Sequence, residues 1–568
     1  MKLKINIEKL LVLILLLLVS ISAKSQINPG VDFDLNGYIN SRLDAGQTTI
    51  IVPPGRYRVQ PMGNTHLSFE NRNNVTIIAD DVEMICTETI GAIRITGCTN
   101  FKLQGLSVDY DPLPFTQGEI VAISGDKKIL TVDLIDGYPN RLKSATDKIE
   151  IFDPVSGELV TPTYYGATSV LNTSTRRVTV TKTSGNSNHW EEVGDIVVFD
   201  SKGNTSLPHA IRPIECSNLV LENVILYAGT MFGFYETDCS ASKYINCRVD
   251  RRPLETDIKV RAIKRMRSTV ADAFHSKFAV VGPSYVGCYA GWNGDDGIAI
   301  NGNFHVITET NGNILTVVGK AGKTPNLDVG ETVEMIAYTG ERIPDAVITQ
   351  IVAGRALTTQ EINFLNSQTF YAESADTSTA PNVYYVTVDR PIDLSMGSLI
   401  NSASKIGNGF EIRNCTLGNN RSRGMVVKAG NGIITGNTME GSWGTAIMLA
   451  PKSTWLEAGS GSNIVISNNL VRGCRGAGIA VYSEGSNGYS PVGAHDNIKI
   501  INNTITGSVN PGIVVTSTSN LCLTGNTIQS PDDNILLPSK SNAWNRNVDP
   551  SRTIYLKNVV EFCSDQGR

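Results

Sequence analysis

The sequence predicts an all-β protein whose main part is a right-handed parallel β-helix solenoid, with two small antiparallel β-barrel-like domains inserted into it. Three observations support this fold class: short strand patterns ending in Asn-rich turns recur along the chain, glycine is abundant at 52 of 568 residues, and charged residues make up only 18%. The hydrophobic fraction of 41% supports a sizeable core and excludes a wholly disordered chain.

The first 25 residues have the pattern of a secretory signal peptide. Three lysines precede an unbroken apolar run from Leu10 to Val19, which is about half of what a membrane-spanning helix requires. Small residues then favour cleavage before Gln26. We therefore expect an exported protein, periplasmic or secreted, with no membrane span once the signal is removed; an uncleaved anchor is the alternative.

The repeats are clearest in the C-terminal part of the chain. Segments such as Asn463-Ile-Val-Ile-Ser-Asn-Asn and Asn497-Ile-Lys-Ile-Ile-Asn-Asn alternate apolar and polar residues and end at Asn, which is typical of short strands with tight corners. Such segments start at residues 432, 463, 497 and 520, so they are 31, 34 and 23 residues apart. Asn and Gly tolerate the left-handed backbone of sharp corners. Stacked coils of a parallel β-helix fit this pattern best.

Two stretches, 115–208 and 303–403, lack the Asn-rich turns. Each contains alternating strands joined by a hairpin turn, at Gly125-Asp126 and at Asn311-Gly312. We interpret them as inserted β domains that serve as ligand modules, as cleft walls or as plain structural additions. The predicted organisation is a signal peptide at 1–25, N-terminal coils at 26–114, a first insert at 115–208, central coils at 209–302, a second insert at 303–403 and C-terminal coils at 404–568.

Ten cysteines in an exported chain ordinarily suggest disulfides. Their contexts recur, however: Cys247 and Cys415 each follow Asn, whereas Cys98 and Cys216 each stand two residues before Asn. Recurrence at equivalent repeat positions favours buried thiols that stack as small hydrophobic groups, with disulfides as the alternative. No Cys or His grouping has zinc-site spacing, and we expect neither a metal nor another cofactor.

Three aspartates are the candidate catalytic residues. Alignment of Ala271-Asp272-Ala273-Phe274 with Asp295-Asp296-Gly297-Ile298 places Asp272 and Asp296 in one column, 24 residues apart, on strands about 4.8 Å from each other. Flanking glycines permit a bend that also turns Asp295 outward. Close carboxylates repel and raise at least one pKa, which suits a general acid paired with a general base. A solvated acidic corner and a calcium site are the alternatives.

The pattern Asp272 … Asp295-Asp296 resembles the active site of family 28 polygalacturonases, although no Gly-His-Gly follows the pair and their Arg-Ile-Lys motif has only a loose counterpart in Arg423 … Lys428. Those missing residues serve acidic sugars, so pectin is disfavoured. The mature chain resembles glycoside hydrolase family 110 more closely. That resemblance rests on the Val-Pro-Pro-Gly strand near residue 52, both inserts, the segment Trp292-Asn293-Gly294-Asp295-Asp296-Gly297 and the loop Trp455-Leu456-Glu457-Ala458-Gly459.

The resemblance implies an exo-acting α-1,3-galactosidase that removes terminal α-1,3-linked galactose from blood-group-B-type or linear glycans by an inverting mechanism. It implies Asp295 as the general acid and Asp272 with Asp296 as the groups that hold and deprotonate water; the acid and base roles remain exchangeable. The strand pattern predicts that His275 points inward from Asp272 in a supporting role. Further candidates for sugar binding are Trp292, Arg423, Lys428, Trp455 and Glu457.

Two other functions stay open. One is another β-helix enzyme acting on polysaccharide, either a polygalacturonase-like hydrolase or a lyase; the other is a non-catalytic carbohydrate-binding solenoid. The expected partner in each case is a glycan. Nucleic acid is not expected, because 49 Lys and Arg against 54 Asp and Glu give a net charge of −5, without the basic excess that nucleic-acid binding requires.

Overall fold

The structure, a computed structural model, describes residues 28–144, 149–160, 167–183, 190–201, 208–320, 324–368, 383–508, 511–529 and 554–564. The predicted signal peptide lies outside the described residues. Among the helices of the described part, none is long and apolar enough to cross a membrane.

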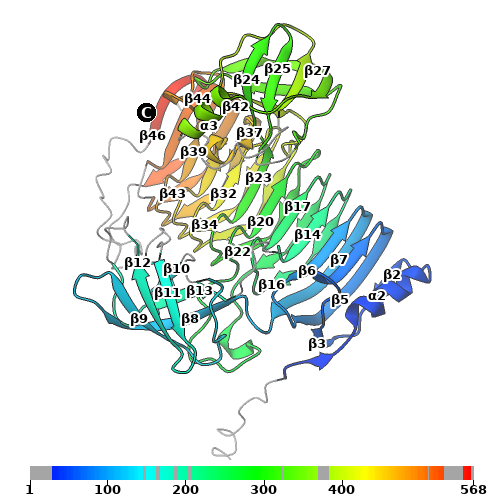
Figure 1. Cartoon of the computed structure of the whole chain (residues 1–568), viewed down its shortest axis with the longest axis vertical. Helices are drawn as coiled ribbons and strands as arrows, with labels where there is room; N and C mark the ends of the chain where they lie inside the picture. Colours follow the sequence, from blue (N-terminus) through cyan, green and yellow to red (C-terminus); the bar gives the residue numbers. More distant parts are fainter. Residues whose placement is uncertain are drawn as a thin grey trace, which may run out of the picture.

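The main body is a β-helix in which short strands of successive coils pair in parallel (Figure 1). The pairings follow three ladders, named A, B and C here. Ladder A consists of β4 (Thr65–Glu70), β6 (Gly91–Thr96), β14 (Ile211–Ile214), β17 (Phe234–Thr237), β20 (Phe274–Lys277), β23 (Ile298–Asn303), β32 (Met425–Val427), β35 (Ile447–Leu449), β39 (Ile479–Val481) and β44 (Ile513–Thr524), which pairs in turn with β46 (Ile554–Ser564).

The other two ladders complete each coil. Ladder B consists of β2 (Thr49–Ile51), β5 (Asn73–Cys86), β7 (Thr99–Tyr110), β15 (Val220–Glu222), β18 (Lys243–Ile245), β21 (Ser284–Val286), β30 (Glu411–Arg413), β33 (Ile433–Thr435), β37 (Ser462–Ser467), β42 (His495–Ile501) and part of β44. Ladder C consists of β1 (Val31–Asp32), β3 (Gly55–Val59), the later parts of β5 and β7, β16 (Ile225–Leu226), β19 (Arg248–Val249), β22 (Tyr289–Gly291), β31 (Thr416–Gly418), β34 (Thr438–Glu440), β38 (Leu470–Arg472), β43 (Thr504–Thr506) and β45 (Thr527–Gln529). Helix α2 (Leu35–Asp44) lies at the N-terminal end of the coils (Figure 1).

Stacked side chains fill the inside of the coils. Phe234 lies on Phe274 and Tyr244 lies on Tyr285, with ring centroids 4.8 and 4.9 Å apart. The cysteines form such stacks too, because the backbone N–H of Cys216 donates to the Cys239 sulfur on the next coil. The predicted burial of cysteine thiols is confirmed for Cys86, Cys98, Cys216, Cys239, Cys247, Cys288, Cys415 and Cys474.

One pair of cysteines departs from this expectation. Cys522 and Cys563 are register partners on β44 and β46, and a disulfide joins them. Cys563 lies at the C-terminal end of the chain, in a segment whose sequence shows no clear coil repeat. No repeat spacing places Cys563 beside Cys522, and for this pair the structure has the disulfide that the sequence analysis kept as the alternative.

Asparagines hold the corners of the coils as predicted. Asn437, Asn469 and Asn503 form a buried ladder in which each side-chain amide donates to the next asparagine's Oδ1 at 2.9 Å. A second ladder joins Asn463 to Asn431 and Asn497 to Asn463. The backbone of the asparagines in this second ladder has a positive φ near 50°, which is the left-handed region that asparagine tolerates.

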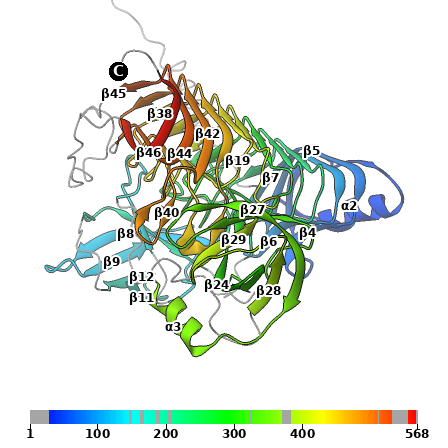
Figure 2. The same ribbon diagram turned by 90° about the horizontal axis from the view of Figure 1, so that it is seen from above.

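The two inserts are separate antiparallel sheets. The first is a six-stranded sheet, and the second is a closed barrel that projects from the coil stack together with α3 (Thr359–Ser367) (Figure 2). The predicted hairpin turns do join β8 to β9 and β24 to β25. The first sheet consists of β8 (Phe115–Ile123), β9 (Ile129–Leu134), β10 (Ile149–Phe152), β11 (Ala167–Asn172), β12 (Arg177–Lys182) and β13 (Ile196–Asp200); the barrel consists of β24 (His305–Asn311), β25 (Ile314–Val318), β26 (Thr332–Ile336), β27 (Arg342–Ala353), β28 (Val383–Val388) and β29 (Ser398–Ser402).

A buried ion network fixes the first insert to the coils. Arg267, which lies five residues before Asp272, donates to Glu150 at 2.8 Å and also to Asp200. All three side chains are almost fully buried. Moving the insert away from the coils would leave a buried charge without its partner, which is costly. This network therefore holds the insert beside the segment that leads to the aspartates.

Candidate active site

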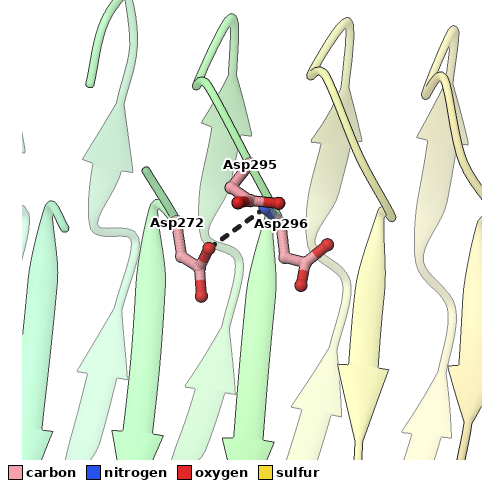
Figure 3. Close-up of side chains that lie close together, drawn as sticks. All are labelled: Asp272, Asp295 and Asp296. Atoms are coloured by element: carbon pink, nitrogen blue, oxygen red, sulfur yellow. Dashed lines mark hydrogen bonds between the residues drawn. The ribbon is translucent and has the colours of Figure 1, made fainter. Parts of the chain in front are cut away.

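Three aspartates meet on the outer face of ladder A, where β20 and β23 begin (Figure 3). Phe274 pairs with Ile298 and Ile298 pairs with Met425. Asp272, Asp296 and Arg423 each stand two residues before these partners, so they follow one another along one column. The structure thus brings together the trio that the sequence alignment proposed.

The trio is compact. One carboxylate oxygen of each aspartate lies within 4.8 Å of the others, and the backbone N–H of Asp296 donates to Asp272 Oδ1 at 3.2 Å. The side chains of Asp272 and Asp296 are 7% and 5% exposed, whereas that of Asp295 is 32% exposed. Two carboxylates therefore lie at the floor of the site and the third lies nearer to solvent.

Two buried asparagines hold the bend that turns both Asp295 and Asp296 outward. The Asn293 amide donates to the carbonyl oxygens of Asp295 and Asp296 at 2.9 and 2.7 Å. The Asn420 amide donates to the carbonyl oxygens of Asp295 and Arg423, both at 2.7 Å. Backbone carbonyls that are satisfied in this way need no regular strand pairing. Sequence reasoning missed Asn420, whose place beside Asp295 depends on the coil that follows the second insert.

Two arginines neutralise part of the charge. Arg423 makes a bidentate pair with Asp296, with Nε–Oδ1 and Nη2–Oδ2 distances of 2.7 and 2.6 Å, and its backbone N–H adds a third bond to Asp296 at 2.9 Å. Burial opposes ionisation of Asp296, but Arg423 outweighs it and lowers the pKa of this carboxyl. Arg421, which the sequence reasoning also missed, lies 2.7 Å from Asp295.

Asp272 has the opposite electrostatic character. Burial raises the pKa of Asp272 to about 6, even though a hydrogen bond from His275 opposes the rise and the neighbouring Asp296 adds to it. The trio therefore combines a carboxyl that gains a proton in mildly acid solution with one that stays ionised. Such a divergence within one site is what acid–base chemistry requires.

The predicted inward orientation of His275 is wrong. Its Nδ1 lies 2.7 Å from Asp272 Oδ2, on the outer face of the ladder. The chain bends at the buried Ala273, so strand alternation restarts there: Phe274 enters the core and His275 points outward. A pattern of alternation that starts from Asp272 fails because Asp272 lies before the strand.

Lys428 and Glu457 form an ion pair at 2.9 Å, and the Lys428 side chain is only 2% exposed. Glu457 belongs to β36 (Glu457–Ala458), which folds back and pairs with the end of β23. Arg423 outweighs burial to lower the pKa of Asp296, and Lys428 adds to this effect. Against the opposing effect of burial, Lys428 and then His275 lower the pKa of Glu457 to about 2. Lys428 thus acts on the charge of Asp296, and Glu457 interacts with His275 beside Asp272. Sugar binding by Lys428 and Glu457 stays a prediction.

The two tryptophans lie in different surroundings. The Arg251 guanidinium lies 3.3 Å from the Trp292 ring centroid, so one face of this ring is covered and a sugar has only the other face to stack on. Trp292 also lines a cavity of about 650 Å³ together with Arg251 and Tyr289, and none of the three candidate catalytic aspartates lines it. Trp455 is 48% exposed at the end of the 3₁₀ turn η2 (Ser453–Trp455), and Lys320 of the second insert donates to its carbonyl oxygen.

Three carboxylates this close also resemble a cation site, because hard cations such as Ca²⁺ prefer several carboxylate oxygens. The donor set argues against it. Both oxygens of Asp296 accept hydrogen bonds from Arg423, and Arg421 pairs with Asp295. A divalent cation would have to displace or face two guanidinium groups. The residues fit an acid–base site better than a metal site.

Comparison with known families matches residues 395–528 to the family described as "Right handed beta helix region". No curated protein matches the sequence. Solved structures similar to the chain include a mannuronan C-5 epimerase A-module from Azotobacter vinelandii (12% identity, 95% of this chain and 97% of that chain, TM-score 0.39). A second is an endo-xylogalacturonan hydrolase from Aspergillus tubingensis (10% identity, 87% of this chain and 88% of that chain, TM-score 0.41). A third is the surface adhesin PfbA of Streptococcus pneumoniae (8% identity, 86% of this chain and 86% of that chain, TM-score 0.32). Identities this low do not extend to substrate or activity.

Proposed function

We propose that this protein is an inverting glycoside hydrolase that removes terminal α-1,3-linked galactose from glycans. The observation that carries the proposal is the trio of aspartates with unlike surroundings: the pKa of Asp272 is raised to about 6, whereas Arg423 keeps the pKa of Asp296 low. Glycoside hydrolysis needs one carboxyl group as acid and another as base. The galactose specificity rests on the resemblance to family 110.

In this mechanism Asp272 is the general base. A base whose pKa lies near the working pH removes a proton from water most effectively, and Asp272 meets that condition. Asp296, held ionised by Arg423, accepts the second hydrogen of the same water and orients it. Asp295, the most exposed of the three and the general acid that the resemblance to family 110 implies, takes up a proton from solvent once its side chain has left Arg421, and donates that proton to the glycosidic oxygen of the leaving sugar.

The inverting route needs room for that water. Carboxyl groups of inverting enzymes are about 6.5–9.5 Å apart, and those of retaining enzymes are about 5–5.5 Å apart. The nearest oxygens of the trio lie within 4.8 Å, so the proposal requires the Asp295 side chain to turn from Arg421 toward the substrate. Asp272 and Asp296 then stay together on the water side, and the spacing that matters is the one from this pair to Asp295.

The test is incubation with an α-1,3-galactosyl trisaccharide, followed by proton NMR in the first minutes. We expect free galactose to appear, with the β-anomer first. Early α-galactose would overturn the inverting mechanism. An ultraviolet-absorbing unsaturated product would indicate a lyase, and binding of the glycan without any product would indicate a non-catalytic binding protein. The Asp295→Asn variant serves as the control for contaminating galactosidase.

A further inference from the structure

A hollow lies on the outer face of ladder A, on the N-terminal side of the aspartates, and reaches to β14, two strands before β20 in the ladder. Its volume is about 440 Å³, and it lies over β4, β6 and β14. Arg94 and Arg212, which are register partners on β6 and β14, are both exposed. The lining is mixed: Ser68, Glu70, Arg94, His209 and Arg212 are polar or charged, whereas Met62, Ile90, Ile93 and Pro208 are apolar.

A chain of rings connects this hollow to the trio. The His209 ring lies 4.2 Å from the Tyr235 ring, and Tyr235 lies 5.4 Å from His275, whose Nδ1 contacts Asp272. Burial raises the pKa of Tyr235 to about 12, and the Asp272 carboxylate adds to that rise. Arg212, Tyr235 and His275 occupy successive positions of one outward row of ladder A. A row of side chains along the helix axis therefore leads from the hollow to the site.

The opposite direction is filled. The next positions of the same row toward the C-terminus are Ala299, Val426 and Met448, each at most 4% exposed. They form a small apolar cluster with Ala450 and Tyr482. The segment β36 lies across the end of β23, and Glu457 on it is paired with Lys428. A glycan that reaches the trio thus finds buried apolar side chains on one side and, on the other, a row that leads to a hollow with exposed arginines.

We infer that the sugars on the leaving-group side of the scissile bond run from Asp295 into this hollow, and that the terminal galactose lies against the Lys428–Glu457 pair. The inference rests on the proposed function. Rings such as those of His209 and Tyr235 present apolar faces on which a sugar ring packs, and the guanidinium groups of Arg94 and Arg212 donate several hydrogen bonds to hydroxyl groups. The ligand expected there is a neutral oligosaccharide of at least two units.

The test compares two substrates in the full-length protein. One is the α-1,3-galactosyl trisaccharide, which would occupy the hollow, and the other is α-galactosyl fluoride, whose leaving group is a single atom. For the Arg94→Ala/Arg212→Ala variant, we expect the ratio of kcat/KM for the trisaccharide to kcat/KM for the fluoride to fall at least about tenfold, since hydrogen bonds from charged groups are lost. Arg472→Ala, which removes an exposed arginine from ladder C, should keep the wild-type ratio.

The two proposals fail in different ways. If the wild-type protein hydrolyses the fluoride and the trisaccharide but the ratio is the same in the double variant, the hollow does not bind the leaving sugars and the inference is overturned. If the wild-type protein hydrolyses neither substrate, the proposed function itself fails. Calorimetry with the Asp295→Asn variant gives an independent readout: the trisaccharide should bind more tightly than galactose, and the two arginine substitutions should remove that advantage.

Discussion

Replacement of Arg423 by methionine tests the electrostatic logic of the site. Methionine keeps most of the volume of the arginine stem but removes the guanidinium that holds both oxygens of Asp296. The Asp296 carboxylate would then remain buried without its main partner. Truncating one member of a buried ion pair costs about 3–5 kcal/mol of folding stability, and we expect a loss of that size at neutral pH.

The loss of folding stability in Arg423→Met should depend on pH, and the surroundings of Asp296 determine in which direction. In the wild-type protein the Asp296 pKa is lowered, so its stabilising contribution is present above the ordinary aspartate pKa and is lost as pH falls through the lower value. Without Arg423, burial remains and raises the Asp296 pKa. The variant should therefore lose stability as pH rises through that raised value and recover part of it in acid, where Asp296 takes up a proton.

Thermal unfolding followed by circular dichroism at pH 4.5 and 7.5 measures this, together with galactose release. We expect the deficit of Arg423→Met to be larger at pH 7.5, and activity there to fall at least about a hundredfold. The double variant Arg423→Met/Asp296→Asn should regain stability at pH 7.5 but stay inactive. Arg413→Met breaks an exposed pair with Glu411 and should cost at most about 1 kcal/mol. An equal deficit for Arg423→Met at both pH values would refute the reasoning.

Three further predictions concern the same site. Asp272→Asn and Asp295→Asn should fold normally, and Asp296→Asn should still fold but with reduced stability, because it leaves Arg423 without its counter-charge. Each variant should lose at least about a hundredfold in trisaccharide hydrolysis, and near wild-type turnover in any two of them would contradict the assignment. Only Asp295→Asn should retain most activity on α-galactosyl fluoride, whose departure needs little protonation. Since Asp272 must be ionised to act as base, kcat/KM should decline as pH falls below the Asp272 pKa of about 6. His275→Leu removes a hydrogen bond that lowers the Asp272 pKa, so this decline should begin at higher pH. His275→Gln can donate a hydrogen bond again and should shift the decline less. Activity should survive EDTA, and a loss that calcium restores would show that the carboxylates bind a cation.

The sequence by itself determined the β-helix, because its evidence is local and repeated. Alternating strands, Asn at the corners and cysteines in recurring contexts each report on one coil, and their recurrence reports on stacking. The same register aligned Asp272 with Asp296 and then with Arg423, since a fixed offset between coils holds even across the second insert. Within the described residues the inserts, too, are the antiparallel sheets that their hairpin turns predicted.

Only the tertiary structure decided the contacts that depend on departures from the repeat. The bend before β20 turned His275 toward Asp272, because strand alternation does not extend past the end of a strand. The fold-back of β36 brought Glu457 to Lys428, and the chain after the second insert brought Arg421 to Asp295. The pairing of Cys522 with Cys563 likewise depends on the C-terminal strand β46. No repeat spacing in the sequence predicts where β46 lies in the stack. A periodic sequence fixes what lies on neighbouring coils, whereas bends, loops and chain ends meet only when the whole chain has folded.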